Sequence, residues 1–141
     1  MRKQFRYEAA ALMFAGTVAI ACKGAYAPQP GSVDLKGAWT LTLSGVSAAF
    51  TLTESADSVS GSADYSANPA NPPGCGGESL PASGTVTLNA QVTGNDIRGR
   101  MSFDGRWTPP FNAAIASRDT IRGNLMSVDR GGCAFILVRK K

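Results

Sequence analysis

Apolar and polar side chains alternate along most of the chain from Lys36 onward. The pattern is clear in residues 36–45, where Trp39, Leu41 and Leu43 alternate with threonine and serine. A period of two residues is typical of a strand with one face in a core and the other in water. No window in this part of the chain favours a helical period of 3.6 residues, and glycine and β-branched residues are frequent. The pattern therefore predicts an all-β fold.

Eight alternating segments can be counted in this part of the chain. We expect strands at 38–43, 49–54, 59–65, 85–92, 97–103, 106–116, 120–127 and 133–139. Short turns rich in Gly, Asn or Asp join most neighbours, which is typical of antiparallel hairpins. Residues 66–81 are the exception, because they form a long connection with four prolines. Pro109 and Pro110 interrupt the segment 106–116, so we expect an edge, a bulge or a bend there. The segments predict an eight-stranded antiparallel meander barrel.

A short pattern recurs within these segments. Residues 97–101 (IRGRM) resemble residues 121–125 (IRGNL), and residues 59–63 (VSGSA) are a fainter third copy. In each copy the glycine falls on the apolar-facing register. Glycine at an inward strand position allows the sharp coiling that closing a barrel needs. The repeat therefore predicts a feature of the barrel geometry before it predicts a functional site.

The first 21 residues are typical of an export signal, which we expect to form a helix. Arg2, Lys3 and Arg6 precede an apolar run at 9–21 that is 13 residues long. Such a run suits the core of a secretory signal and is too short to span a bilayer comfortably. We therefore expect three parts, of which the second is a flexible tether: a signal peptide at 1–21, a tether at 22–35 and a β-barrel domain at 36–141.

Two cleavage sites remain open at the end of the signal. Residues 25–27 (AYA) have the small-x-small pattern, but Pro28 follows directly and makes them a poor substrate for the usual signal peptidase. Residues 19–22 (AIAC) resemble a bacterial lipoprotein box, with Ala19 where leucine is usual. Cys22 would then take a lipid and become the new N-terminus. We favour lipidation of Cys22, and we expect an exported protein of the cell envelope or periplasm, anchored to a membrane or otherwise secreted.

The three cysteines of an exported chain leave one unpaired. Cys75 and Cys133 lie in glycine-rich surroundings within the barrel domain and are the natural disulfide pair. Cys22 is then lipidated or discarded with the signal. A redox-active pair is the alternative, but the chain has no Cys-x-x-Cys spacing and no base beside either cysteine. We expect a structural bridge that contributes roughly 4 kcal/mol by closing a long loop.

Composition and charge argue against several classes of function. The chain has 14 basic and 10 acidic residues, and loss of the signal removes three basic residues and one acidic residue, so +4 becomes +2. This is unlike the dense basic stripe of a nucleic-acid-binding protein. The absence of histidine excludes Ser-His-Asp and Cys-His nucleophile systems and His-ligated zinc or haem. Because the aspartates nearly all fall at turns, we expect no catalysis, no metal and no cofactor.

The barrel domain resembles the calycin architecture, the group that holds lipocalins, avidin-like proteins and some small secreted protease inhibitors. The resemblance is carried by eight antiparallel strands that open on Gly37-Ala38-Trp39 and close on Arg139. It implies that the Trp39 ring packs under the Arg139 guanidinium. The Thr-Asp-Tyr stretch of lipocalins is missing, and Leu41 stands where avidin-like proteins have a polar residue that helps to bind biotin. The resemblance therefore implies a fold without a particular ligand.

Two groups of side chains are candidates for a binding site. Aromatic residues either line a cavity for an apolar ligand or fill the barrel, since eight strands enclose just enough space for side chains. We expect filling in general, and a ligand site at the barrel mouth made by Trp107, Phe111, Tyr65 and Phe103. Three arginines share the outward register of two strands and either dock phosphates or an acidic polymer, or form a solvated face. We favour the solvated face for these three: Arg98, Arg100 and Arg122.

The sequence thus predicts a non-catalytic extracytoplasmic binding module for a small apolar ligand or an envelope component. The alternative is a protein-partner module such as a secreted protease inhibitor, acting through the N-terminal segment or residues 66–81. A purely structural lipoprotein is a third alternative. A cavity with polar groups converging inside would favour the small ligand. A filled interior with an ordered, protruding loop would favour the protein partner.

Overall fold

The structure is a computed structural model that describes residues 33–67, 74–75, 78–127 and 132–141. The expected signal helix, Cys22 and most of the expected tether lie outside the described residues. The strands have these bounds: β1 (Gly37–Leu43), β2 (Val46–Ser55), β3 (Ser58–Ala67), β4 (Gly74–Cys75), β5 (Glu78–Ser79), β6 (Ser83–Thr93), β7 (Asp96–Phe103), β8 (Pro110–Ser117), β9 (Thr120–Leu125) and β10 (Cys133–Arg139).

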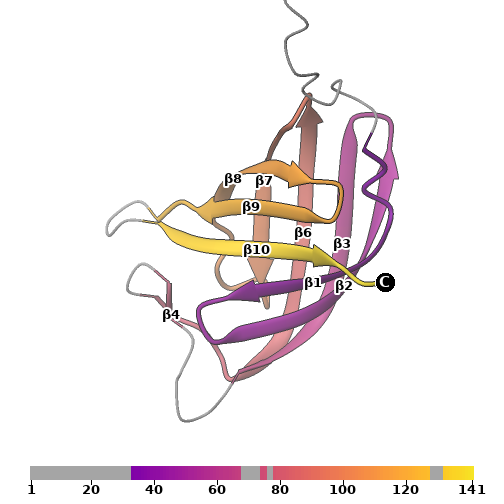
Figure 1. The fold of residues 1–141 in the computed structure, drawn as a ribbon. Helices are drawn as coiled ribbons and strands as arrows, with labels where there is room; N and C mark the ends of the chain where they lie inside the picture. The colour runs from indigo at the N-terminus through magenta and orange to yellow at the C-terminus, as the bar shows by residue number, and fades with distance from the viewer. Residues whose placement is uncertain (1–32, 68–73, 76–77, 128–131) are drawn as a thin grey trace, which may run out of the picture.

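Eight of these strands form one closed antiparallel barrel in the order β1-β10-β9-β8-β7-β6-β3-β2. Neighbours around the barrel are also neighbours along the chain, apart from a small insertion between β3 and β6, so the sheet is a meander (Figure 1). The first strand meets the last, with Trp39 paired to Arg139 and Leu43 paired to Phe135. The all-β, eight-stranded antiparallel barrel predicted from the alternation is confirmed.

The core is made by the alternate residues that each strand turns inward. In β2, for example, Val46, Ala48, Phe50 and Leu52 are buried, while the residues between them are exposed. All side chains that are buried in the described part of the chain are hydrophobic. Their packing removes apolar surface from water at about 25 cal/mol per Å², which is the main term that holds such a barrel together.

Two elements differ from the prediction. The connection 66–81 contains a short hairpin, β4 paired with β5, that the alternation does not reveal because each strand has only two residues. The sixth barrel strand was expected at 106–116 but begins at Pro110. Residues 104–106 make a turn, and Trp107 pairs back with Phe103 in an isolated bridge. Proline cannot donate to a ladder, so the strand starts at the proline and the chain bends before it.

A disulfide joins Cys75 of β4 to Cys133 at the start of β10, with a Cα–Cα distance of 5.4 Å. The pairing predicted from the cysteine count is confirmed. The hairpin β4–β5 lies outside the barrel wall, at the end where β10 begins (Figure 1). Because Cys75 is buried, the bridge fixes the hairpin against the barrel. A disulfide of this kind is typical of an oxidising, extracytoplasmic compartment.

The other end of the barrel is closed by the chain that leads into β1. Leu35 is fully buried, its amide donates to the Glu54 carboxylate at 3.0 Å, and its carbonyl accepts from Trp39 Nε1 at 2.8 Å. Val33, two residues before it, is half-buried against the core. Residues 33–35 were assigned to the tether from sequence, and in the structure they pack against the barrel and close its end.

Arg139, at the end of β10, connects the last strand to residues 33–36, which we call the entry segment. Its guanidinium lies over the Trp39 ring, 4.5 Å from the centroid. Nη1 donates to the Lys36 carbonyl at 2.8 Å, and Nη2 donates to the carbonyl of Asp34. Nε lies 3.5 Å from Asp119 Oδ1 in the turn between β8 and β9. One side chain therefore contacts both ends of the domain and a hairpin turn; we call it the Arg139 clasp.

Gly37 makes room for the clasp. It has φ of +126°, a conformation that residues with a side chain rarely adopt, and a Cβ at this position would lie 3.3 Å from Arg139 Nη1. Gly37, Trp39 and Arg139 carry the calycin resemblance, and the structure brings them together. The Arg139 guanidinium covers the Trp39 ring and lies close to the backbone of Gly37.

Candidate functional site

The four aromatic residues expected to bind a ligand lie in two separate places. The rings of Tyr65 and Phe103 meet edge to face with centroids 5.9 Å apart, and Trp107 stacks on Phe103 at 5.4 Å. Phe111 instead packs edge to face against Phe135, at 5.4 Å. Only Trp107 is partly exposed, since Tyr65, Phe103 and Phe111 are buried. The structure brings three of the four together, and these rings pack against one another.

Tyr65 is the one member of this group with a polar atom in the core. It is 3% exposed, and its hydroxyl has no hydrogen-bond partner among the described residues. Burial raises the pKa of the phenol above its ordinary value, and the nearby Asp104 carboxylate raises it further. The phenol is therefore neutral at physiological pH, and it gives this end of the core a donor without a charge.

The outer wall of the barrel offers a different kind of surface. Outward side chains that are paired across the strands line up in rows, and three successive rows each contain one arginine. The Arg122 row runs through Thr42, Ile136, Arg122, Ala114 and Asp96. The Arg98 row runs through Ala134, Asn124, Asn112, Arg98, Gln91 and Ser58. The Arg100 row runs through Pro110, Arg100, Asn89 and Ser60.

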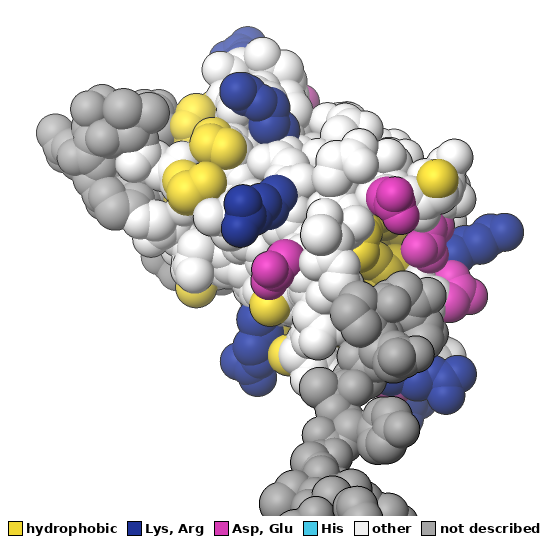
Figure 2. Space-filling view, turned by 90° about the horizontal axis from the view of Figure 1, so that it is seen from above, with side chains coloured by type: hydrophobic (Ala, Val, Ile, Leu, Met, Phe, Trp, Pro, Cys, Tyr) yellow, Lys and Arg dark blue, Asp and Glu magenta, His cyan; other side chains and the backbone are white. Residues whose placement is uncertain are grey.

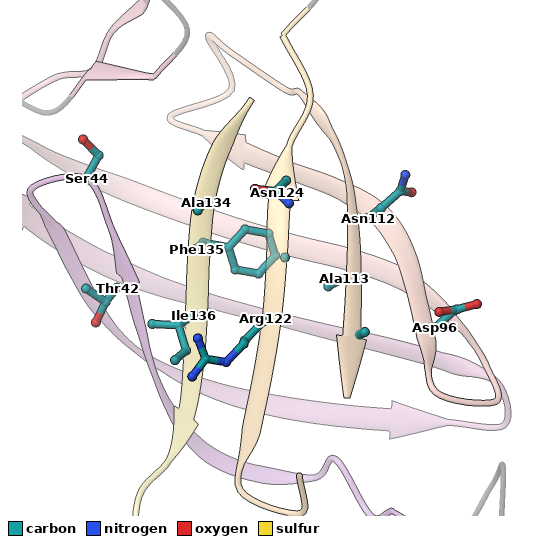
Figure 3. A pocket seen from close by; sticks show the side chains of 12 residues that line it. Thr42, Ser44, Asp96, Asn112, Ala113, Arg122, Asn124, Ala134, Phe135 and Ile136 are labelled. Atoms are coloured by element: carbon teal, nitrogen blue, oxygen red, sulfur yellow. The ribbon is translucent and has the colours of Figure 1, made fainter. Parts of the chain in front are cut away.

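The first hollow lies between the Arg122 row and the Arg98 row, over β8, β9, β10 and the end of β1. We call it the Gly123 hollow; its volume is about 730 Å³, and its floor is formed at Gly123, Ala113 and Phe135. Figure 3 shows the two rows on either side of the Phe135 ring, with Asn112 and Asn124 on one side and Arg122 on the other. The Arg122 side chain points across β10 toward Ile136 (Figure 3).

A second hollow lies between the Arg98 row and the Arg100 row, over β3, β6 and β7. We call it the Gly99 hollow; its volume is about 420 Å³, and Val59, Ala90 and Gly99 form its floor. Its walls carry two arginines together with hydroxyl and amide side chains: Arg98, Arg100, Ser58, Ser60, Asn89 and Gln91. The Arg98 row is therefore a wall of both hollows.

A closely packed glycine lies at the floor of each hollow. Gly123 and Gly99 occupy inward positions, and a Cβ at Gly123 would lie 2.4 Å from Phe135 Cζ. At Gly99 a Cβ would lie 2.2 Å from the carbonyl oxygen of Asn89. A side chain would have no room at either position, and each glycine lines its hollow. The sequence repeat noted above thus marks the floors of the two hollows.

The arginines of these rows are not neutralised by neighbours. Within the described ranges, the one ion pair is that between Arg139 and Asp119, and the side chains of Arg98, Arg100 and Arg122 form no hydrogen bond. Asp96, at the end of the Arg122 row, is the one carboxylate that lines either hollow. The amide of Asn112 is 3.7 Å from Met126 Sδ, and Asn124 has no partner. The rows therefore present free donors and net positive charge.

Acidic residues gather elsewhere. At the barrel end that Leu35 closes, Glu54 and Asp57 line a hollow around Val33, Val92 and Ile115. Figure 2 shows acidic side chains around a small apolar area on one side of the molecule, with basic side chains spread more widely over the same view. In the part of the chain that the structure describes, no three Cys, Asp or Glu residues are placed to hold a metal ion.

Comparison with models of protein families, with curated proteins and with solved structures found no match. The described residues include no helix that is long and apolar enough to cross a membrane. Sequence reasoning placed the three arginines on the outer face, but it missed Asn112, Asn124 and Asn89 as their companions. The alternation marks these residues as outward, whereas their grouping depends on the register between strands.

Proposed function

We propose that this protein is a non-catalytic extracytoplasmic binding module that binds an envelope component on the outer wall of its barrel. The observation that carries the proposal is the pair of hollows on either side of the Arg98 row, whose walls carry arginine side chains without partners among amide and hydroxyl groups. A few polar groups that converge on a concave surface are what a specific binding site requires.

The packed interior of the barrel favours the outer wall as the binding site. The buried side chains described in the barrel are hydrophobic and in contact, and Tyr65, Phe103 and Trp107 stack on one another where a ligand was expected. None of these three lines the Gly123 hollow or the Gly99 hollow. A small apolar ligand inside the barrel is therefore the less favoured form of the proposal.

The setting of the module is also part of the proposal. We infer a calycin-like lipoprotein anchored through Cys22, in which Val33 and Leu35 join the tether to one end of the barrel. The disulfide between Cys75 and Cys133 supports export, because such bridges form and persist in oxidising compartments. With a lipid at Cys22, residues 22–32 would allow the barrel to stand off the membrane by at most about 40 Å.

A second candidate function, a protein-partner module, is favoured by the β4–β5 hairpin. This hairpin lies outside the barrel wall and is fixed to it by the disulfide (Figure 1). A fixed, protruding element loses little conformational entropy when it binds, which is the property of a good inhibitory loop. Deletion of residues 68–79 also removes the disulfide, so circular dichroism must first show that the variant folds. A folded deletion variant would lose binding under this alternative and keep it under the main proposal.

The main proposal is tested by filling the Gly123 hollow. Ala114 is exposed and lines the hollow, and Ala116 is exposed on the same strand but does not line it. We expect a protein purified from its own envelope to retain a bound component in native mass spectrometry, and Ala114→Trp to lose it while Ala116→Trp keeps it. The same spectra report the mass of any lipid on Cys22. Equal retention by both variants, or no bound component in the wild-type protein, would overturn the proposal.

A further inference from the structure

We propose that the ligand of this surface is an anionic polysaccharide, a chain of sugars that carries carboxylate or phosphate groups. This inference rests on the proposed function and deepens it. The chain would lie along the Arg98 row, with the Gly123 hollow on one side and the Gly99 hollow on the other.

The spacing of the arginines is the first reason. Arg98 and Arg100 are two residues apart on β7, so their Cα atoms are about 7 Å apart. Arg122 stands two strands away and one row over, which places it about 12 Å from Arg98. None of the three has a partner within the described part of the chain. Separated guanidinium groups of this kind suit a polymer with repeated charges better than one compact anion.

The groups between the arginines are the second reason. Asn112 and Asn124 in the Arg98 row, and Asn89 in the Arg100 row, offer both donors and acceptors, which is what sugar hydroxyl groups need. Ala134 and Ile136 supply apolar surface beside them, and Ile136 is paired across the strands with Arg122 (Figure 3). A sugar ring has polar edges and apolar C–H faces, so a surface with both kinds of group is complementary to it.

The shape of the surface separates this ligand from an anionic membrane. A lipid surface is bound by coplanar cations with apolar side chains that reach into it. Here the outward side chains stand on a curved barrel wall, with concave floors at Gly99 and Gly123. Asp96, at the end of the Arg122 row, would also face a membrane unfavourably. A flexible chain can follow the curved wall, whereas a bilayer cannot.

The experiment measures binding of two acidic polymers by isothermal titration calorimetry. Polygalacturonate supplies carboxylates, a ribitol phosphate teichoic acid supplies phosphates, and fully methyl-esterified polygalacturonate is the neutral control. We expect binding to at least one acidic polymer that weakens with added salt. Arg98→Gln, Arg100→Gln and Arg122→Gln should each weaken it about threefold, and the triple variant about thirtyfold.

Matched variants separate local from general charge effects. Arg106 is exposed but lies in the turn before Trp107, outside both hollows, so Arg106→Gln should leave the affinity unchanged. Asp96→Asn removes the one carboxylate of the rows and should strengthen binding about twofold. All of these residues are exposed, so each variant is expected to fold, and circular dichroism checks this.

Three results would overturn the inference. They are the absence of binding to both acidic polymers, binding that the arginine variants do not weaken, and binding only to vesicles of phosphatidylglycerol. Should Ala114→Trp still release an envelope component while no acidic polymer binds, the ligand class would be wrong and the proposed binding function would stand. Should neither experiment show binding, both would fall.

Discussion

Gly99 and Gly123 determine the local shape of the barrel wall through the side chain that each lacks. At Gly99 the carbonyl oxygen of Asn89 and the Cβ of Ala90 occupy the space that a side chain would need. At Gly123 the Phe135 ring and the Cβ of Ala113 do the same. Backbone atoms cannot move aside cheaply, but the end of a ring can. Gly99 is therefore the more demanding of the two positions.

Gly99→Ala is expected to lower the free energy of unfolding by about 3 kcal/mol, because the new methyl group would meet backbone only 2.2 Å away. Urea denaturation followed by tryptophan fluorescence measures the change. Asn124→Ala, an exposed change in the same wall, serves as the control and should alter stability by less than about 0.5 kcal/mol. Equal stability of Gly99→Ala and the wild-type protein would contradict the close approach of β6 to β7 at Gly99.

Among the elements, β10 carries the covalent attachment of the β4–β5 hairpin. β10 is apolar on both faces, with Phe135 and Leu137 in the core and Ile136 and Val138 outside, where Val138 is 43% exposed. Its first residue, Cys133, holds the hairpin. A hairpin of two-residue strands has too few backbone hydrogen bonds to persist alone. We therefore expect the covalent bond to β10 to hold it in place, together with the buried Leu80.

Replacement of both Cys75 and Cys133 by serine is expected to lower stability by about 4 kcal/mol, since the bond closes a loop with a sequence separation of 58. Thermal unfolding followed by circular dichroism tests this. The barrel strands should still form, and limited proteolysis should now cut within 68–79 before it cuts elsewhere. Cys22→Ala, which leaves the loop closed, is the control. Unchanged resistance to protease in the double variant would show that the hairpin is held by other contacts.

At the scale of the molecule, the barrel is closed by the meeting of its two ends. β1 pairs with β10 along the strands, and the Arg139 clasp adds contacts to the Trp39 ring, to two carbonyl groups of the entry segment and to Asp119. A planar guanidinium can make all of these contacts at once, because its face stacks on a ring while its edge donates hydrogen bonds. An ammonium group cannot do both. The clasp thus joins segments about a hundred residues apart in sequence.

Arg139→Lys is expected to lower the free energy of unfolding by about 2 kcal/mol, although it keeps the charge. Lysine has one ammonium group and cannot contact the ring and both carbonyl groups together. Chemical denaturation gives the value, and hydrogen exchange should show faster exchange of the Leu35 and Trp39 amides. Lys140→Gln, a charge change at the exposed neighbour, should have little effect. A lysine variant as stable as the wild-type protein would mean that charge alone accounts for the clasp.

Alternation, turn residues and the cysteine count were enough to predict the all-β class, the eight barrel strands, the disulfide partners and the outward direction of Arg98, Arg100 and Arg122. These follow from local facts, because a period of two residues, turn residues and cysteine parity can be read without knowing which strands meet. The start of β8 was misplaced, since the bend at Pro109 and Pro110 is set by the pairing of Trp107 with Phe103. The β4–β5 hairpin was missed, because two-residue strands have no readable period.

Which outward side chains lie next to one another depends on the folded barrel and could not be predicted from the local pattern. Asn112 and Asn124 became neighbours of Arg98, and Arg122 became the neighbour of Ile136, through the register between strands. The folded barrel also decided that Gly99 and Gly123 form floors of hollows and that Tyr65, Phe103 and Trp107 pack against one another. Register and barrel closure are long-range properties, since a shift of one residue would turn every side chain to the other face.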